Sequence, residues 1–158
     1  MLYHASFNVR EPANVAQALA EMLDATAIRA PVPPFPDGSW FVCYGDDNGS
    51  FLEVLPWGNI LDPDTRFGIG FDDDMRPRAG SHVLVRTPHA KEEIRAKAGR
   101  LGWRCEFVDA RLFEVVKVWV ENAVLVEFLP PEFLPAYVST FGTEGIGSLD
   151  AKLRAMEV

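Results

Sequence analysis

Two stretches of the chain repeat the same order of hydrophobic and polar positions. Apolar and polar residues alternate over residues 2–9, as in a strand with one buried face. Residues 12–24 then carry apolar side chains on one helical stripe behind a proline that suits a first helical turn. The second stretch alternates over 81–86 and turns helical over 87–102, with Thr87 as the expected N-cap. Each stretch therefore begins with a strand and an amphipathic helix.

Each predicted helix is followed by three more strand patterns. In the first stretch, Asn48-Gly49 separates two apolar runs and is typical of a tight hairpin turn, so the strand that holds Glu53 should pair antiparallel with its predecessor. Turns of two or three residues separate the strands of the second stretch. The predicted strands after the helices are 27–30, 39–44 and the run around Glu53, and then 103–108, 112–120 and 123–129.

The order of elements predicts an α+β fold of two tandem βαβββ modules, residues 1–60 and 81–130. Residues 61–80 hold several prolines and glycines without sustained periodicity, and we interpret them as the linker. A C-terminal extension at 131–158 should form short helices. Its apolar residues, Phe133 among them, should cover a sheet or meet a second subunit, so we expect a homodimer.

Composition narrows the classes of partner. The 158 residues carry a net charge of −8, which would repel a phosphate backbone, and no basic cluster offsets it, so we expect no nucleic-acid partner. No apolar run approaches the roughly 20 residues of a membrane span, and we expect a cytoplasmic protein without a membrane partner. Cys43 and Cys105 lack metal-site or CxxC spacing and should be small apolar fillers.

An acidic residue interrupts the last apolar strand of each module. Glu53 lies in Leu-Glu-Val-Leu-Pro and Glu127 in Val-Glu-Phe-Leu-Pro, an offset of 127 − 53 = 74 residues. A histidine lies in the first strand of each module, His4 and His82, at the similar offset of 82 − 4 = 78. Because a buried carboxylate needs a partner, the repeat suggests that each module contributes one acid and one imidazole to a shared site.

Imidazole nitrogens and carboxylate oxygens suit first-row divalent metals with open positions for water or substrate. The candidate metal ligands are therefore His4, Glu53, His82 and Glu127, for one divalent ion among Ni, Co, Zn, Mn and Fe. Taken one at a time, each histidine would more often be structural, and each glutamate could be half-exposed at a sheet edge. Their recurrence in register favours the metal site.

Duplicated modules with these residues resemble the vicinal oxygen chelate superfamily, which includes glyoxalase I. The resemblance rests on Tyr-His4-Ala, Leu-Glu53-Val, Ser-His82-Val and Val-Glu127-Phe, and it covers about residues 1–130. It implies that each module curls its mixed sheet into a half-cup and that paired cups enclose a metal. The order His, Glu, His, Glu is similar to that of glyoxalase I. Whether the cups pair within one chain or between two chains stays open.

The resemblance implies a metal-dependent lyase or isomerase that acts on a small substrate with vicinal oxygens through a metal-stabilised enediolate. Glu127 would then be the catalytic base, while His4, Glu53 and His82 hold the ion. One alternative is a non-catalytic small-molecule binding protein, similar to bleomycin resistance proteins, with an aromatic cup and no metal. Others are an enzyme similar to extradiol dioxygenases and a subunit with a degenerate site.

Overall fold

The computed structural model describes residues 3–32, 34–65, 69–74 and 82–155. Strands and helices follow one another in the predicted order, and both βαβββ modules are present. The first contains β1 (His4–Val9), α1 (Pro12–Leu23), β2 (Thr26–Arg29), β3 (Trp40–Cys43) and β4 (Phe51–Pro56), followed by the hairpin β5 (Asn59–Leu61) and β6 (Ile69–Phe71). The second contains β7 (Val83–Arg86), α2 (Lys91–Arg100), β8 (Arg104–Asp109), β9 (Glu114–Val120) and β10 (Val124–Leu129), and the chain continues into α3 (Leu134–Phe141) and α4 (Ile146–Ala155).

The two modules build two four-stranded sheets of identical topology, with strand orders β1-β4-β3-β2 and β7-β10-β9-β8. In each sheet the first strand of the module pairs in parallel with the last strand, while the other neighbours are antiparallel. The predicted α+β fold of two βαβββ units with mixed sheets is therefore confirmed.

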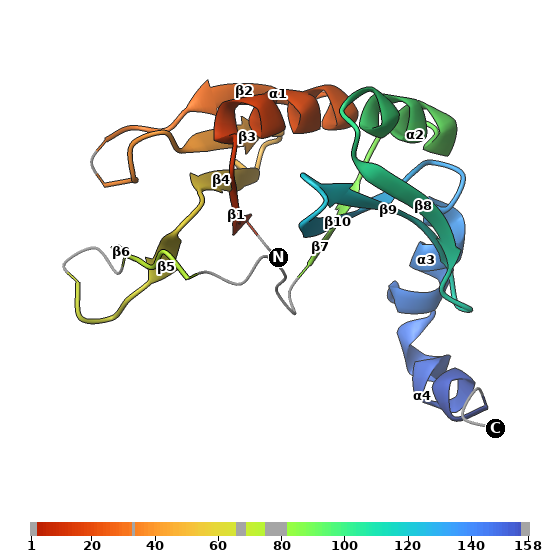
Figure 1. The fold of residues 1–158 in the computed structure, drawn as a ribbon. Coiled ribbons are helices and arrows are strands. Elements are labelled where there is room, and N and C mark those ends of the chain that lie inside the picture. The colour runs from red at the N-terminus through yellow and green to blue at the C-terminus, as the bar shows by residue number, and fades with distance from the viewer. Residues whose placement is uncertain (1–2, 33, 66–68, 75–81, 156–158) are drawn as a thin grey trace.

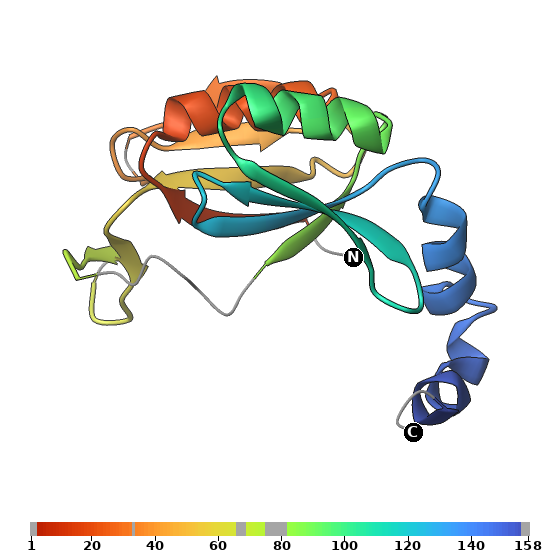
Figure 2. The ribbon, with the colours of Figure 1, turned by 45° about the vertical axis from the view of Figure 1, so that its right-hand side comes forward.

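Helices α1 and α2 lie together on one side of the molecule, each against its own sheet (Figure 1). Their apolar stripes, with Leu19 and Ile94 fully buried, pack on the sheet faces that carry Val54 and Phe128. These residues belong to one continuous hydrophobic core that spans both modules. The opposite face of each sheet has no helix over most of its length (Figure 2), and this is where the acidic residues point.

A buried threonine ties the second module to the first. Thr87 is 0% exposed, and its hydroxyl donates a hydrogen bond to the carbonyl of Met22 at 2.6 Å. The prediction that Thr87 caps the second helix is wrong, because α2 begins at Lys91 with Ala90 as N-cap. Thr87 directly follows β7 and lies against the C-terminal turn of α1, so its hydroxyl satisfies a carbonyl that the helix leaves unpaired.

The predicted linker contains a strand that its composition did not reveal. β6 pairs antiparallel with β5, and together they form a small separate sheet. The hairpin projects from the body below the first module (Figure 1). Linker residues 66–68 and 75–80, together with Ser81 of the predicted strand, lie outside the described residues.

The C-terminal extension covers one end of the second module. Phe133 is 5% exposed and joins the core, whereas Tyr137 and Phe141 pack around Phe113 with ring-centroid distances of 5.0 and 5.7 Å. Helix α4 continues away from the body in both views (Figures 1 and 2). None of the helices in the described part of the chain combines the length and hydrophobicity of a membrane span.

Candidate functional site

The second module brings His82 and Glu127 together on the open face of its sheet. His82 immediately precedes β7, and the parallel pairing sets Leu84 beside Glu127 on β10. The imidazole Nε2 of His82 lies 3.3 Å from Glu127 Oε2. The carboxylate is 8% exposed, whereas half of the imidazole is exposed. Glu127 is thus a nearly buried acid with an accessible histidine at its edge.

Lys117 contacts the other oxygen of the same carboxylate. It lies directly opposite Glu127 in the antiparallel β9–β10 pair, and its Nζ is 3.4 Å from Oε1. Burying the Glu127 carboxylate costs free energy, and the contacts with Lys117 and His82 offset this cost. In this state Glu127 is held between an imidazole and an ammonium group.

The first module repeats this arrangement with a different third partner. His4 opens β1 and Glu53 lies in β4, with His4 Nε2 4.0 Å from Glu53 Oε1. The hydroxyl of Ser6 donates a hydrogen bond to Glu53 Oε2. The His4 ring stacks on Phe51, its register partner on β4, at 5.0 Å between centroids. A serine and an aromatic ring therefore replace the lysine of the second module.

The two-residue period of the strands explains why these groups share the open faces. Along β1, Phe7 and Val9 pack against the helix side, so His4 and Ser6 point the other way. Along β10, Val126 and Phe128 occupy the buried face and leave Glu127 on the open one. The alternation seen in the sequence thus positions both pairs.

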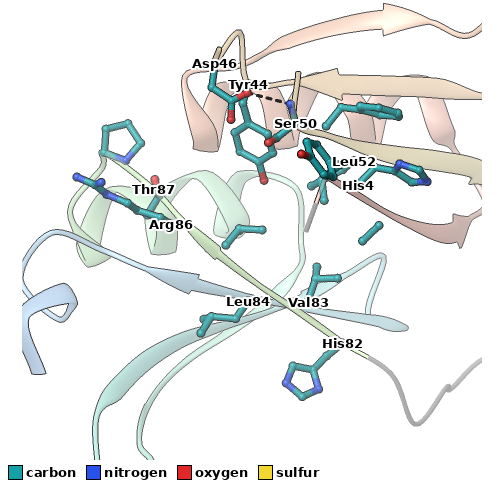
Figure 3. Close-up of a pocket in the computed structure, with 15 residues that line it drawn as sticks. His4, Tyr44, Asp46, Ser50, Leu52, His82, Val83, Leu84, Arg86 and Thr87 are labelled. Atoms are coloured by element: carbon teal, nitrogen blue, oxygen red, sulfur yellow. Dashed lines mark hydrogen bonds between the residues drawn. The ribbon is translucent and has the colours of Figure 1, made fainter. Parts of the chain in front are cut away.

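All four predicted ligands are close to one partner each, and the structure arranges them as two pairs. Among the described residues, no group of three or more His, Cys, Asp or Glu side chains is close enough to hold a metal ion. His4 and His82 lie along the same cavity and point in different directions (Figure 3). Each pair offers one imidazole and one carboxylate, which fits half of the coordination shell of a first-row divalent ion.

The cavity lies between the β3–β4 turn of the first module and strand β7 of the second. Its volume is about 660 Å³, within the range of small-molecule sites. Phe51, Leu52 and Leu84 contribute apolar walls, and Tyr44 and Arg86 contribute polar groups. Burial and, after it, the nearby Asp46 charge raise the pKa of Tyr44 to about 12. Its hydroxyl therefore stays protonated at neutral pH and can donate a hydrogen bond.

Sequence reasoning missed the partners of the two acids. Ser6 shares a face with His4 in the predicted alternation and could have been found from that pattern. Lys117 required the pairing register of β9 and β10, and Tyr44 required the packing between modules. The aromatic residues among the described lining of this cavity are Tyr3, Tyr44 and Phe51.

Comparisons with known proteins give a match by structure alone. No protein-family model matches the chain, and a search of curated proteins finds no match. The fosfomycin resistance protein FosX from Listeria monocytogenes, solved with Mn(II) and sulfate, is 12% identical with a TM-score of 0.54, over 89% of this chain and 97% of that one.

Two further solved structures agree. FosX from Mesorhizobium loti is 15% identical with a TM-score of 0.51, over 81% of this chain and 89% of that one. A Bacillus anthracis protein described as glyoxalase family is 14% identical with a TM-score of 0.53, over 81% and 92% of the two chains. At such identities the likeness concerns the fold. The chain has the paired βαβββ fold of the vicinal oxygen chelate superfamily.

Proposed function

We propose that this protein is a divalent-metal-dependent enzyme, a lyase or isomerase of the glyoxalase type that acts on a small substrate with two neighbouring oxygens. The observation that carries the proposal is the repeated pair of imidazole and nearly buried carboxylate, His4 with Glu53 and His82 with Glu127. Two exposed half-sites of the same composition, in the same place in two modules, suit one function better than two independent structural roles. The Mn(II) in the FosX neighbour supports a divalent ion.

We further propose that the complete site forms between two chains. Each pair lies on the face of its sheet that no helix covers, with both histidines half exposed. A second copy could place the first module's pair opposite the second module's pair and bring four ligands together twice, in a two-fold symmetric homodimer. The exposed apolar side chains Ile28 and Val138, at 49% and 53% exposed, support an interface with another copy.

The residues then take distinct roles. His4, Glu53 and His82 would hold the ion, with Glu127 as a fourth ligand that can detach to move a proton, and the ion would stabilise negative charge that develops on the substrate oxygens. Glu127 has an environment suited to moving a proton, because it is nearly buried and a side-chain nitrogen lies within 3.4 Å of each of its oxygens, 3.3 Å for His82 and 3.4 Å for Lys117. Lys117 would neutralise Glu127 before substrate binds, so it is a positioning residue for that carboxylate.

Complementation between two variants tests the shared site. We expect that the His4→Ala and His82→Ala proteins each bind at least about tenfold less nickel or manganese than the unaltered protein, since loss of a ligand exceeds the effect of losing a second-shell partner. A heterodimer of the two variants, purified through two different tags, should regain about half of the normal metal content, because one of its two sites is intact.

The measurement is metal content by elemental analysis after dialysis, with Arg29→Ala as a surface control. Metal-free heterodimers would overturn the cross-chain site and favour coordination within one chain. Normal metal content in both single variants would overturn the assignment of the histidines as ligands.

A non-catalytic binding protein is the second candidate, and one observation favours it. A row of aromatic rings lies on the open face of the first sheet. Phe41 contacts Phe35 on one side and Phe51 on the other, and the His4 ring stacks on Phe51. Ser6 also engages the Glu53 carboxylate without any ion. Such an aromatic surface suits a flat apolar ligand. A protein that stays metal-free in the same experiment and binds aromatic ligands would favour this function.

A further inference from the structure

Four side-chain hydroxyls line the cavity between the modules in the described part of the chain, and one of them is half-buried without a partner. Thr87 donates its hydrogen bond to a carbonyl of α1. Ser50 donates hydrogen bonds to a neighbouring aspartate, and Tyr3 lies at the rim, 56% exposed. The remaining hydroxyl belongs to Tyr44, for which the described residues provide no hydrogen-bond partner. A donor in such a position gains free energy when a ligand supplies an acceptor.

Local packing fixes the direction of the Tyr44 side chain. Tyr44 directly follows β3, and its backbone amide donates a hydrogen bond to the carbonyl of Ser50 at 3.1 Å, across the turn that leads into β4. Its ring packs against the hydrophobic core. Figure 3 shows the hydroxyl pointing from the first module toward β7, into the cavity. The unpaired donor therefore faces the space that a ligand would occupy.

The surroundings of this hydroxyl disfavour negative charge. Burial and, after it, the charge of Asp46 raise the pKa of Tyr44 to about 12. Both effects act in the same way on an anionic ligand group at the hydroxyl, because burial removes the charge from water and Asp46 repels it. Arg86 does not offset them, since its side chain is exposed and its guanidinium points away from the Tyr44 hydroxyl (Figure 3). The group that accepts the hydrogen bond should therefore be uncharged.

Apolar side chains make up the walls on either side of Tyr44. Leu52 of β4 lies on the side of the first module, and Leu84 and Val85 of β7 lie on the side of the second. None of these three side chains can accept a hydrogen bond from a ligand. A carbonyl oxygen fits this environment better than a hydroxyl or a primary amide, because it accepts hydrogen bonds and donates none. The volume of about 660 Å³ suits a small molecule.

We propose that this cavity binds an uncharged carbonyl compound with an apolar body, and that the Tyr44 hydroxyl donates a hydrogen bond to the carbonyl oxygen. The body lies against Leu52 and Leu84. Because His4 and His82 line the same cavity, the substrate of the proposed enzyme would be a neutral compound. That last step rests on the proposed function. Recognition of the carbonyl does not, because Tyr44 is not among the proposed metal ligands.

Three probes of one carbon skeleton test the inference on the full-length protein after treatment with a chelator. They are heptan-2-one, hexanoate and heptan-2-amine, which are neutral, negative and positive at neutral pH, and each is titrated calorimetrically. Heptan-2-one should bind most tightly. Tyr44→Phe keeps the ring and removes the donor, so it should weaken binding of heptan-2-one by about fivefold, the effect of one hydrogen bond.

Tyr3→Phe is the matched control, because it makes the same chemical change at the exposed rim of the cavity. It should leave the affinity for heptan-2-one unchanged, and so should Arg86→Ala, since a neutral ligand has no use for the guanidinium. Three results would each overturn the inference: full affinity for heptan-2-one in Tyr44→Phe, binding of hexanoate or heptan-2-amine as tight as that of the ketone, and no saturable binding of the ketone.

The outcome is independent of the proposed function, because heptan-2-one has a single oxygen and the protein is free of metal in these titrations. A protein that recognises heptan-2-one through Tyr44 and takes up no divalent metal would keep the inference and remove the proposed function. A protein that takes up metal but binds heptan-2-one equally well with Tyr44→Phe would keep the proposed function and remove the inference.

Discussion

Metal affinity is expected to fall by about 100-fold or more when Glu127 is replaced by Gln. The amide keeps the shape of the side chain and removes the negative charge that a divalent ion requires, and losing even a second-shell partner typically costs 10–100-fold. Turnover of any confirmed substrate should fall as well, because an amide cannot accept the proton. Competition with a chromophoric chelator for Ni(II) measures the affinity.

Glu114→Gln is the matched control for this change. Glu114 lies at the exposed start of β9 in the same sheet, so its replacement removes one negative charge without touching the site. Thermal unfolding should confirm that both variants fold. If Glu127→Gln retains the affinity of the unaltered protein, Glu127 is no ligand, and full turnover in that variant would eliminate it as the base.

Replacing Phe128 by Ala is expected to reduce the free energy of unfolding by about 3–5 kcal/mol. Phe128 is 0% exposed and has the largest side chain among the fully buried residues that the structure describes. It lies next to Glu127 on the opposite face of β10, between Val116 and Val85 of the neighbouring strands. The cavity that it leaves weakens the core that joins both modules. Thermal denaturation should show a melting temperature roughly 10 °C lower.

Phe71→Ala gives the comparison for the same chemical change at the surface. The Phe71 side chain is 66% exposed, so its loss should alter stability by no more than about 0.5 kcal/mol. The described core would be contradicted if the Phe128→Ala protein had the melting temperature of the unaltered protein. It would also be contradicted if Phe71→Ala lowered stability as much as Phe128→Ala.

The sequence was sufficient to predict the fold and the sheet face on which Glu53 and Glu127 lie. Alternation over β1 and β10 separates His4 from Val9 and Glu127 from Phe128, because the side-chain period of a strand is two. The repeat of His and Glu then places each pair in equivalent strands. Parallel pairing of β1 with β4 and of β7 with β10 brings each histidine close to its glutamate.

Lys117 shows how a small error in register hides a site residue. A two-residue turn at 121–122 would pair Val120 with Ala123 and set Val116 opposite Glu127. The actual pairing joins Val120 to Val124, with Ala123 in the turn, so Lys117 lies opposite Glu127 instead. Because a shift of one residue exchanges the two faces of a strand, the pattern alone could not identify this lysine.

Three features could not be predicted from local patterns: the cavity, the burial of Thr87 and strand β6. Thr87 follows an apolar strand and precedes a proline, which is typical of an N-cap, yet Thr87 is buried and bonded to the carbonyl of Met22 in α1, and α2 begins at Lys91. The cavity depends on the packing between the modules, because its lining comes from the β3–β4 region of the first and from β7 of the second. Local patterns carry no signal for such packing.

The metal content of the purified protein tests the central claim most directly. After incubation with nickel, cobalt, zinc, manganese and ferrous iron in turn and removal of free ions, elemental analysis should find about one ion per chain for at least one of these metals. The His82→Ala protein, treated in the same way, should contain at least tenfold less. A protein that stays substoichiometric with every one of the five metals would contradict the metal-dependent function assigned to His4, Glu53, His82 and Glu127.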